Sequence, residues 1–356
     1  MDSFILKSKF GGLGVGENYP IRVNCNIGIN CISEYHREID KIDSIFNSKF
    51  VPDIMMDLST IKINEPLYEY IINEKKIPVG TVPTYTLFEK NKGFDKIKLL
   101  DSIEDQAYKG VSFFTLHFTA TPDLYEIAKK NRKIPVTSRG GGLVLFDSVF
   151  NKRDGSLLIE LFDDIVNIAL NHDILISLGT TFRPAGIIEA RDEVHIKETI
   201  KQLEICKKLR LLGVKVMLEN FGHIDLIELE KHVEIIKEFN VPIMPLGPIP
   251  TDIAIDNDHI AAAIGASFSC FWGIAHIINS ISPFEHSKSD ITINDTIKAI
   301  ETAQLAAHIV NLTRFSKCRD KDINILNERS KTRSCIMDNS IACNRCSDKC
   351  PLKLPI

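Results

Sequence analysis

Residues 173–220 read DILISLGTTFRPAGIIEARDEVHIKETIKQLEICKKLRLLGVKVMLEN. A short apolar run at 173–179 is followed by apolar residues at helical spacing over 194–212, and then by a second apolar run at 215–220. A strand, a long amphipathic helix and another strand in this order are typical of two parallel strands joined by a crossover helix. This stretch therefore predicts an α/β protein built on a parallel sheet.

The same alternation continues on both sides of this stretch. Amphipathic patterns at 35–46, 65–76, 157–171 and 227–239 predict helices, and two more helices are expected at about 259–280 and 294–312. Eight strand–helix units in about 300 residues predict a (β/α)8 TIM barrel, with a doubly wound open sheet as the alternative. The eight expected strands are 22–28, 53–58, 78–83, 113–118, 135–139, 173–179, 215–220 and 242–249.

Composition narrows the class of protein. The 356 residues carry a formal net charge of −4 with basic residues spread along the chain, which does not favour nucleic acid or an anionic membrane as partner. No stretch is long and apolar enough for a membrane span, and the start of the sequence lacks a secretory signal, so we expect a cytoplasmic protein. The cysteine count is nine, an odd number that does not suit a disulfide framework.

The expected strands end in polar or chemically capable residues. Active sites of barrel enzymes lie where the strands end, so these side chains are expected to share one functional site. Loop polarity would supply Asp, Ser and Thr there, but it does not explain His, Arg, Glu and Asn together. The residues are Asn24, Asn26, Met56, Asp57, Tyr85, His117, Ser138, Arg139, Arg183, Glu219, His223, Thr251 and Asp252.

Three cysteines lie close together near the end of the sequence, in the string Cys343-Asn-Arg-Cys346-Ser-Asp-Lys-Cys350. Three thiolates at this spacing suit an iron–sulfur cluster with one iron left open, and an open iron can chelate S-adenosylmethionine. The alternatives are a zinc knuckle, which needs a fourth ligand, or incidental cysteines. We expect an N-terminal extension at 1–20, the barrel at 21–315, a linker at 316–338 and a small cluster-binding tail at 339–356.

Two further patterns could bind ligands. The string Ser138-Arg-Gly-Gly-Gly142 combines flexible backbone with a guanidinium, which suits a phosphate or carboxylate, although it could also be a plain flexible loop. Glu219-Asn-Phe-Gly-His223 and Glu285-His286 each place an imidazole near a carboxylate and could together hold a divalent metal. Taken singly, such histidines are more often structural, and the same applies to His117 and His259.

These motifs, read in order, resemble the phosphomethylpyrimidine synthase (ThiC) family of thiamine biosynthesis. The resemblance runs from about Val23 to His308 and returns at the cysteines of the tail. Besides the strings above, it rests on Val23-Asn-Cys-Asn-Ile-Gly28, Met56-Asp-Leu-Ser-Thr60, Gly80-Thr-Val-Pro83, Thr115-Leu-His117, Ser177-Leu-Gly179, Leu246-Gly-Pro248, Thr251-Asp-Ile-Ala254 and Asp258-His259.

The resemblance implies a dimeric radical S-adenosylmethionine enzyme with a barrel fold. It would rearrange 5-aminoimidazole ribotide, a phosphorylated small molecule, into the pyrimidine phosphate precursor of thiamine, with a reductant protein such as flavodoxin or ferredoxin. Cys343, Cys346 and Cys350 would hold a [4Fe-4S] cluster, and His223 and His286 would bind Zn²⁺ or another divalent metal. Glu219 and His259 are the expected catalytic residues. The expected substrate-binding residues are Asn26, Met56, Tyr85, His117, Ser138, Arg139, Gly140, Arg183 and Glu219.

Some positions depart from the family pattern. Thr180-Thr-Phe-Arg183 stands where the family has Asp-Gly-Leu-Arg, and a family tyrosine is replaced near Met244. Asn220-Phe-Gly-His223 stands for Gly-Pro-Gly-His. A missing carboxylate beside a polar substrate can change specificity. We therefore expect a divergent paralogue, with two alternatives: a 5-hydroxybenzimidazole synthase-like enzyme of cobamide lower-base biosynthesis, or a non-catalytic protein that binds ribotide or metal.

Overall fold

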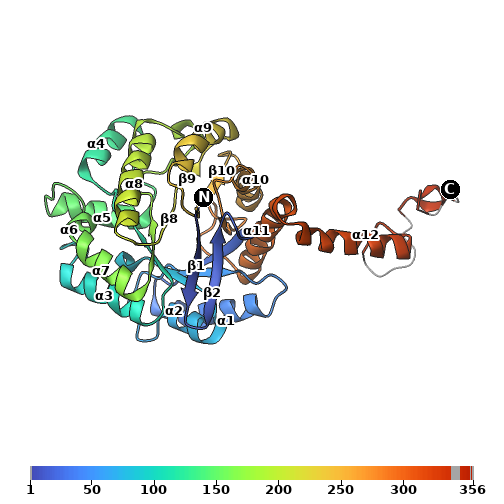
Figure 1. Cartoon of the computed structure of the whole chain (residues 1–356), viewed down its shortest axis with the longest axis horizontal. Helices are drawn as coiled ribbons and strands as arrows, with labels where there is room; N and C mark the ends of the chain where they lie inside the picture. The colour runs from blue at the N-terminus through green and yellow to red at the C-terminus, as the bar shows by residue number, and fades with distance from the viewer. Residues whose placement is uncertain (1, 338–344, 353, 355–356) are drawn as a thin grey trace. The chain divides into compact units, whose positions relative to one another are not determined.

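The computed structural model describes residues 2–337, 345–352 and 354. The chain forms two compact units, Met1–Ala307 and His308–Ile356. The larger unit is an α/β fold of TIM-barrel type, in which helices surround a curled parallel sheet (Figure 1). The parallel α/β architecture expected from the sequence is thereby confirmed.

Seven parallel strands form the main sheet, in the order β11-β3-β4-β5-β6-β7-β8. The sheet curls so that one segment, 242–244, bonds to both of its edges: the Leu218 amide of β8 donates to Pro242 O, and the Ile277 amide of β11 donates to Ile243 O. The strands are β3 (Arg22–Ile27), β4 (Ile54–Asp57), β5 (Val79–Thr81), β6 (Phe113–Leu116), β7 (Leu175–Leu178), β8 (Val216–Leu218) and β11 (Ile277–Asn279). A separate pair joins β9 (Phe221–His223) to β10 (Leu246–Ile249).

A β-hairpin precedes the parallel strands. It consists of β1 (Ser3–Ser8) and β2 (Gly11–Gly16), paired antiparallel, and Figure 1 draws it in blue within the ring of helices. Leu6 and Val15 of the hairpin are buried in one apolar cluster with Met56, Met217 and Met244. The Asp2 amide donates to Asn240 O, just before segment 242–244, so the hairpin covers the end at which the strands begin. The opposite end, where the strands finish, remains for ligands.

Within the unit Met1–Ala307, the helices follow the strands and cover the outside of the sheet. Several begin at an aspartate whose carboxylate accepts amide hydrogen bonds of the first turn, as Asp95 does for α3, Asp192 for α8 and Asp225 for α9. The helices are α1 (Tyr35–Phe46), α2 (Leu67–Tyr70), α3 (Lys96–Tyr108), α4 (Pro122–Asn131), α5 (Arg139–Phe150), α6 (Leu157–Glu160), α7 (Phe162–His172), α8 (Glu193–Leu211), α9 (Leu226–Lys237), α10 (Asp258–Phe271), α11 (Ile293–Arg314) and α12 (Asp320–Thr332).

Two expected elements were wrong. Residues 135–139 do not form a strand: Ser138 caps α5 by accepting from the Gly141 amide, and Arg139 is the first residue of that helix. The expected helix 259–280 ends at Phe271, and Ile277–Asn279 is instead the strand that pairs with β3. Residues 135–138 are irregular backbone that leads into α5, and a run of three to five residues is too short to tell a strand from such a segment. In the second case, a short apolar run has the same local pattern in a buried helix and in a buried strand.

Candidate active site

Asparagine side chains bridge neighbouring strands at the end where the strands finish. The Asn24 amide nitrogen donates to Asn26 Oδ1 at 2.8 Å and to Asn279 Oδ1 at 2.6 Å, and Asn279 in turn donates to Pro245 O. Asn26 lies in register with Met56 of β4, which places these two expected substrate contacts side by side. The Asn24 Oδ1 atom is buried and has no hydrogen-bond partner in the described chain. A polar group on a ligand could satisfy such an atom.

Tyr85, Arg139, Arg183 and Glu219 form one electrostatic group. The guanidinium of Arg139 lies 5.3 Å from the centre of the Tyr85 ring. Burial raises the pKa of Tyr85, and both arginines oppose that shift. Burial also raises the pKa of Glu219 to about 7, against the attraction of Arg183. The Glu219 carboxyl group can therefore exchange a proton near neutral pH, as a general acid or base must.

His117 is a neutral, enclosed imidazole. Burial, with help from Arg183, lowers the pKa of His117 to about 3. Its Nε2 atom lies 2.9 Å from Ser138 Oγ, while Nδ1 is buried without a partner in the part of the chain that the structure describes. The ring fits because Gly140 and Gly179 flank it: a Cβ atom at these positions would come within 2.4 Å and 2.7 Å of ring atoms. His117 can thus serve as an uncharged hydrogen-bonding group.

The amino end of α5 is suited to an anion. The first amides of a helix lack partners within the helix, and the helix dipole favours negative charge there. Arg139 lines a cavity of about 240 Å³ together with Asn26. The other two cations of that cavity are paired, Arg37 with Asp290 and Lys41 with Glu38, whereas Arg139 has no ion pair among the residues described. Arg139 is therefore the guanidinium of this cavity that remains available to an anionic ligand.

His223 and His286 face each other beside these strand ends. Their ring centres are 5.1 Å apart and their planes are inclined by 71°. Asp252 lies 2.7 Å from Nδ1 of His223, and Asp258 lies 3.0 Å from Nδ1 of His286. A carboxylate that accepts the Nδ1 proton leaves Nε2 as the lone-pair donor, which is the usual arrangement of a metal-binding histidine.

The pair of imidazoles does not amount to a complete ligand set. Within the described residues, no group of three or more His, Cys, Asp or Glu side chains is arranged to hold a metal ion. A metal held by His223 and His286 would therefore keep positions open for water or substrate. The sequence did not predict that Asp252 and Asp258 support these histidines, although both aspartates lie in the strings Thr251-Asp252 and Asp258-His259 on which the resemblance rests.

His259 and the tail complete the expected residues. His259 lies in the first turn of α10, burial lowers its pKa, and its Nδ1 atom is buried without a partner in the described part of the chain. No described interaction joins His259 to Glu219. In the smaller unit, Cys346 is an exposed free thiol and Cys350 a buried one, flanking the short turn Ser347–Lys349. Cys343 lies outside the described residues.

Thr180 occupies the position at which the family pattern has a carboxylate. Its hydroxyl group donates to the backbone oxygen of Glu219 and also receives a hydrogen bond from Gln202. Thr180 is fully buried. This side chain therefore stabilises the protein backbone and offers no carboxylate oxygen to a substrate.

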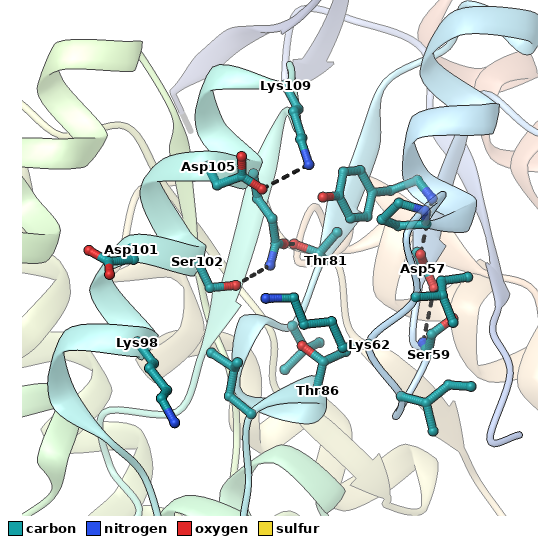
Figure 2. Close-up of a pocket in the computed structure, with 17 residues that line it drawn as sticks. Asp57, Ser59, Lys62, Thr81, Thr86, Lys98, Asp101, Ser102, Asp105 and Lys109 are labelled. Atoms are coloured by element: carbon teal, nitrogen blue, oxygen red, sulfur yellow. Dashed lines mark hydrogen bonds and ion pairs between the residues drawn. The ribbon is translucent and has the colours of Figure 1, made fainter. Parts of the chain in front are cut away.

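A second, larger cavity lies away from these residues. It has a volume of about 320 Å³ and lies between the ends of β4 and β5 and helix α3 (Figure 2). Thr81 donates to Gln106 at 2.6 Å on its wall, and Gln106 donates to Ser102 at 3.1 Å. Of the expected strand-end residues only Asp57 lines it, and none of the expected catalytic, substrate-binding or metal-binding residues does so. We therefore assign the candidate active site to the strand ends, where the expected residues gather, and not to the larger cavity.

The chain is similar to proteins of one known family. Residues 6–354 match the family model described as the Radical SAM ThiC family. The phosphomethylpyrimidine synthase of Caldanaerobacter subterraneus subsp. tengcongensis is 34% identical over 330 residues, covering 89% of this chain and 75% of that protein. The enzyme of the same name from Carboxydothermus hydrogenoformans is 33% identical, with 85% and 72% covered. Among solved structures, a Yersinia pestis DHPS gives a TM-score of 0.49 at 9% identity, covering 87% of this chain and 99% of that one.

Proposed function

Because the chain belongs to the ThiC radical SAM family, as a divergent member, we propose that it is a radical S-adenosylmethionine lyase that rearranges 5-aminoimidazole ribotide. The product would be 4-amino-5-hydroxymethyl-2-methylpyrimidine phosphate, the thiamine precursor. The observation that carries the proposal is the available guanidinium of Arg139 at the amino end of α5, which has Tyr85 as a common neighbour with the titratable carboxyl group of Glu219. A phosphate anchor beside a proton donor suits a ribotide substrate.

The protein's own residues bind and orient the substrate in this proposal. Arg139 holds the phosphate, while Asn26 and Met56 contact the rest of the ribotide from adjacent strands. Neutral His117 contributes a hydrogen bond without adding charge. Glu219 accepts or returns a proton, since its pKa lies near neutrality. His259 is proposed as a second proton-transfer group. Holding the substrate in one orientation lowers the entropic part of the barrier.

The implied cofactors fit the donor atoms present. Cys346 and Cys350 are free thiols, and with Cys343 they would supply the three sulfur ligands of a [4Fe-4S] cluster. His223 and His286 present paired Nε2 atoms that would hold Zn²⁺ or another divalent metal. Together with S-adenosylmethionine, the cluster supplies a 5′-deoxyadenosyl radical when bound.

One observation supports an alternative product. The hydroxyl group of Thr180 is used by backbone and Gln202, so the substrate meets one hydrogen-bond acceptor fewer than the family pattern provides. A site that loses an acceptor can change which conformer or product it favours. The second candidate is therefore 5-hydroxybenzimidazole, formed from the same ribotide.

We further propose a homodimer that receives electrons from flavodoxin or ferredoxin in the cytoplasm. Among the helices that the structure describes, none is long and apolar enough to cross a membrane.

The deciding experiment is an anaerobic assay of the iron- and sulfide-reconstituted protein with S-adenosylmethionine, dithionite and the ribotide. We expect 5′-deoxyadenosine and a pyrimidine phosphate, identified by mass. Recovery of 5-hydroxybenzimidazole would support the alternative. A fully reconstituted protein that never forms 5′-deoxyadenosine would refute the enzymatic proposal and leave a binding protein.

A further inference from the structure

Two buried histidines lie behind the candidate active site and take no part in the proposed chemistry. His195 of α8 and His232 of α9 are fully buried, and their ring centres are 4.7 Å apart. Both Nε2 atoms approach one acceptor, Asn220 Oδ1, at 3.2 Å and 3.3 Å. Asn220 directly follows Glu219 and is itself fully buried. Burying three polar side chains together lowers the stability of the fold unless all their hydrogen-bonding groups have partners, and a fully bonded network holds its surroundings rigid.

The hydrogen bonds define which atoms donate. The Phe221 amide also donates to Asn220 Oδ1, at 2.6 Å, so this atom is the carbonyl oxygen and both imidazoles carry their proton on Nε2. The backbone amide of Arg191 donates to Nδ1 of His195, and the Arg191 guanidinium lies 3.2 Å from Nδ1 of His232. Each ring nitrogen therefore has a partner, and both rings are neutral. The network is complete as it stands.

The side-chain amide nitrogen of Asn220 is linked through Gln202 of α8 to the ends of β7 and β8. This nitrogen donates to Thr199 Oγ1 at 3.2 Å and to Gln202 Oε1 at 3.0 Å. Gln202 in turn donates to Leu178 O, where β7 ends, and to Glu219 O, at 3.2 Å and 3.1 Å. The network therefore fixes the backbone that carries the Glu219 carboxyl group.

The backbone after Asn220 takes an unusual course. Phe221 has φ = 73° and Gly222 has φ = 110°, so two successive residues lie in the left-handed region, which is unfavourable for phenylalanine. A Cβ atom on Gly222 would lie 2.8 Å from Pro184 O. The bend brings the His223 amide to Pro184 O at 3.2 Å and points the imidazole toward Asp252. A local conformation of this cost persists only where its surroundings enforce it.

We propose that Asn220, His195 and His232 are positioning residues that enforce this bend and thereby set His223 relative to Glu219. The role of these residues in the bend does not depend on the proposed function. Its consequence does rest on that function: the divalent-metal site at His223 and the proton-transfer group Glu219 would keep a fixed separation. The imidazole pair contributes neutral donors of fixed direction, which an apolar side chain of similar size cannot replace.

The bend itself can be tested without metal or substrate. Hydrogen–deuterium exchange of the full-length protein should show faster exchange of peptides covering 219–224 in Asn220→Ala than in the parent, because the Phe221 amide loses its acceptor. The His232→Leu variant should show the same change to a smaller degree. In His232→Gln the exchange should return toward the parent rate, because the glutamine amide nitrogen takes the approximate position of Nε2. Unchanged exchange at 219–224 in both Asn220→Ala and His232→Leu would overturn the inference.

A matched control separates positioning from general loss of stability. Gln106→Leu removes another buried, hydrogen-bonded polar side chain, which joins Thr81 to Ser102 on α3. It should lower the melting temperature to a similar degree and leave exchange at 219–224 unchanged. Equal acceleration across the barrel in His232→Leu and Gln106→Leu would mean that the histidine pair only stabilises the fold.

The consequence is tested by titrating Zn²⁺, and Co²⁺ for its visible spectrum, into protein without the cluster. Loss of a supporting hydrogen bond typically costs 10–100-fold in metal affinity, so His232→Leu should weaken Zn²⁺ binding by about tenfold and alter the Co²⁺ spectrum. Gln106→Leu should do neither. If exchange responds as expected but the parent binds no divalent ion, the positioning network stands and the proposed metal site fails. If the parent binds the ion, and His232→Leu binds it equally and shows unchanged exchange at 219–224, the proposed metal site stands and the positioning role of the network is refuted.

Discussion

Burial decides the protonation state of the ionisable side chains at the strand ends. Glu219 and His117 are both enclosed, and removal from water disfavours the charged form of each. The shift is upward for the acid and downward for the base: the pKa of Glu219 rises to about 7 and that of His117 falls to about 3. One site thus holds a proton-exchanging acid and an uncharged imidazole at neutral pH. Their residue types were visible in the sequence, but their protonation depends on neighbours that are distant along the chain.

Glu219 should make folding stability depend on pH. Its pKa in the folded protein is about 7, above the ordinary 4.5, so its contribution is complete below pH 4.5 and is lost as pH rises through 7. Denaturant unfolding of the parent and of Glu219→Gln should show the parent losing up to about 3 kcal/mol relative to the variant over this range. A constant difference between the two proteins at all pH values would contradict the assigned shift.

Arg139 is expected to anchor the substrate phosphate. Arg139→Ala should weaken binding of the ribotide by about 1.5–3 kcal/mol, because a hydrogen bond to a charged phosphate is lost. Arg37→Ala is the matched control, since Arg37 lines the same cavity but is already paired with Asp290. Calorimetry with the ribotide and with its dephosphorylated nucleoside separates binding of the phosphate from binding of the rest of the molecule. An equal loss in both variants would assign the phosphate elsewhere.

At the scale of elements, the amino end of α5 combines three functions in one turn. Ser138 caps the helix and contacts His117, Arg139 faces the cavity, and Gly140 lets the His117 ring lie against the backbone. The sequence indicated the ligand-binding character of this string but placed it at the end of a strand. The error arose because the few residues before Ser138 are too short a run to tell a strand from the irregular segment that leads into a helix, and the cap is recognised only from the hydrogen bond of the Gly141 amide to Ser138.

The glycines of α5 should differ in their response to alanine. Gly140→Ala would place a methyl group 2.4 Å from the His117 ring, so we expect a loss of about 1–3 kcal/mol in unfolding free energy. Gly142→Ala meets only Val136 at 3.6 Å, an ordinary contact, and should be neutral or stabilising by up to about 1 kcal/mol through helix propensity. Thermal or denaturant unfolding of both variants measures this. Similar losses would show that the ring is not held against Gly140.

At the scale of the whole molecule, the expected cluster ligands lie in a different unit from the strand ends. Cys346 and Cys350 belong to the unit His308–Ile356, whereas the strand ends belong to Met1–Ala307. Each unit therefore has its own determinants of stability, and changes to the cysteines should leave the folding of the barrel unaffected.

Cys346→Ser should abolish iron binding without unfolding the larger unit. We expect iron content and the visible absorbance of the reconstituted protein to fall to background, while the main thermal transition stays within about 1 °C of the parent, as expected for a surface change. Cys335→Ser, which alters another exposed thiol of the same unit, is the control and should keep its iron. Unchanged iron content in Cys346→Ser would remove this residue from the cluster ligands.

The alternation of strands and helices over most of the chain, and the polar character of the strand ends, followed from the sequence alone. Apolar periodicity and residue type are local properties, so they can be interpreted from the sequence without the tertiary structure. The tertiary structure alone decided that Ile277–Asn279 completes the sheet beside β3, that the imidazoles of His223 and His286 face each other, and that His195 and His232 converge on Asn220. These features depend on hydrogen bonds and burial between segments far apart in the chain, which no local pattern encodes.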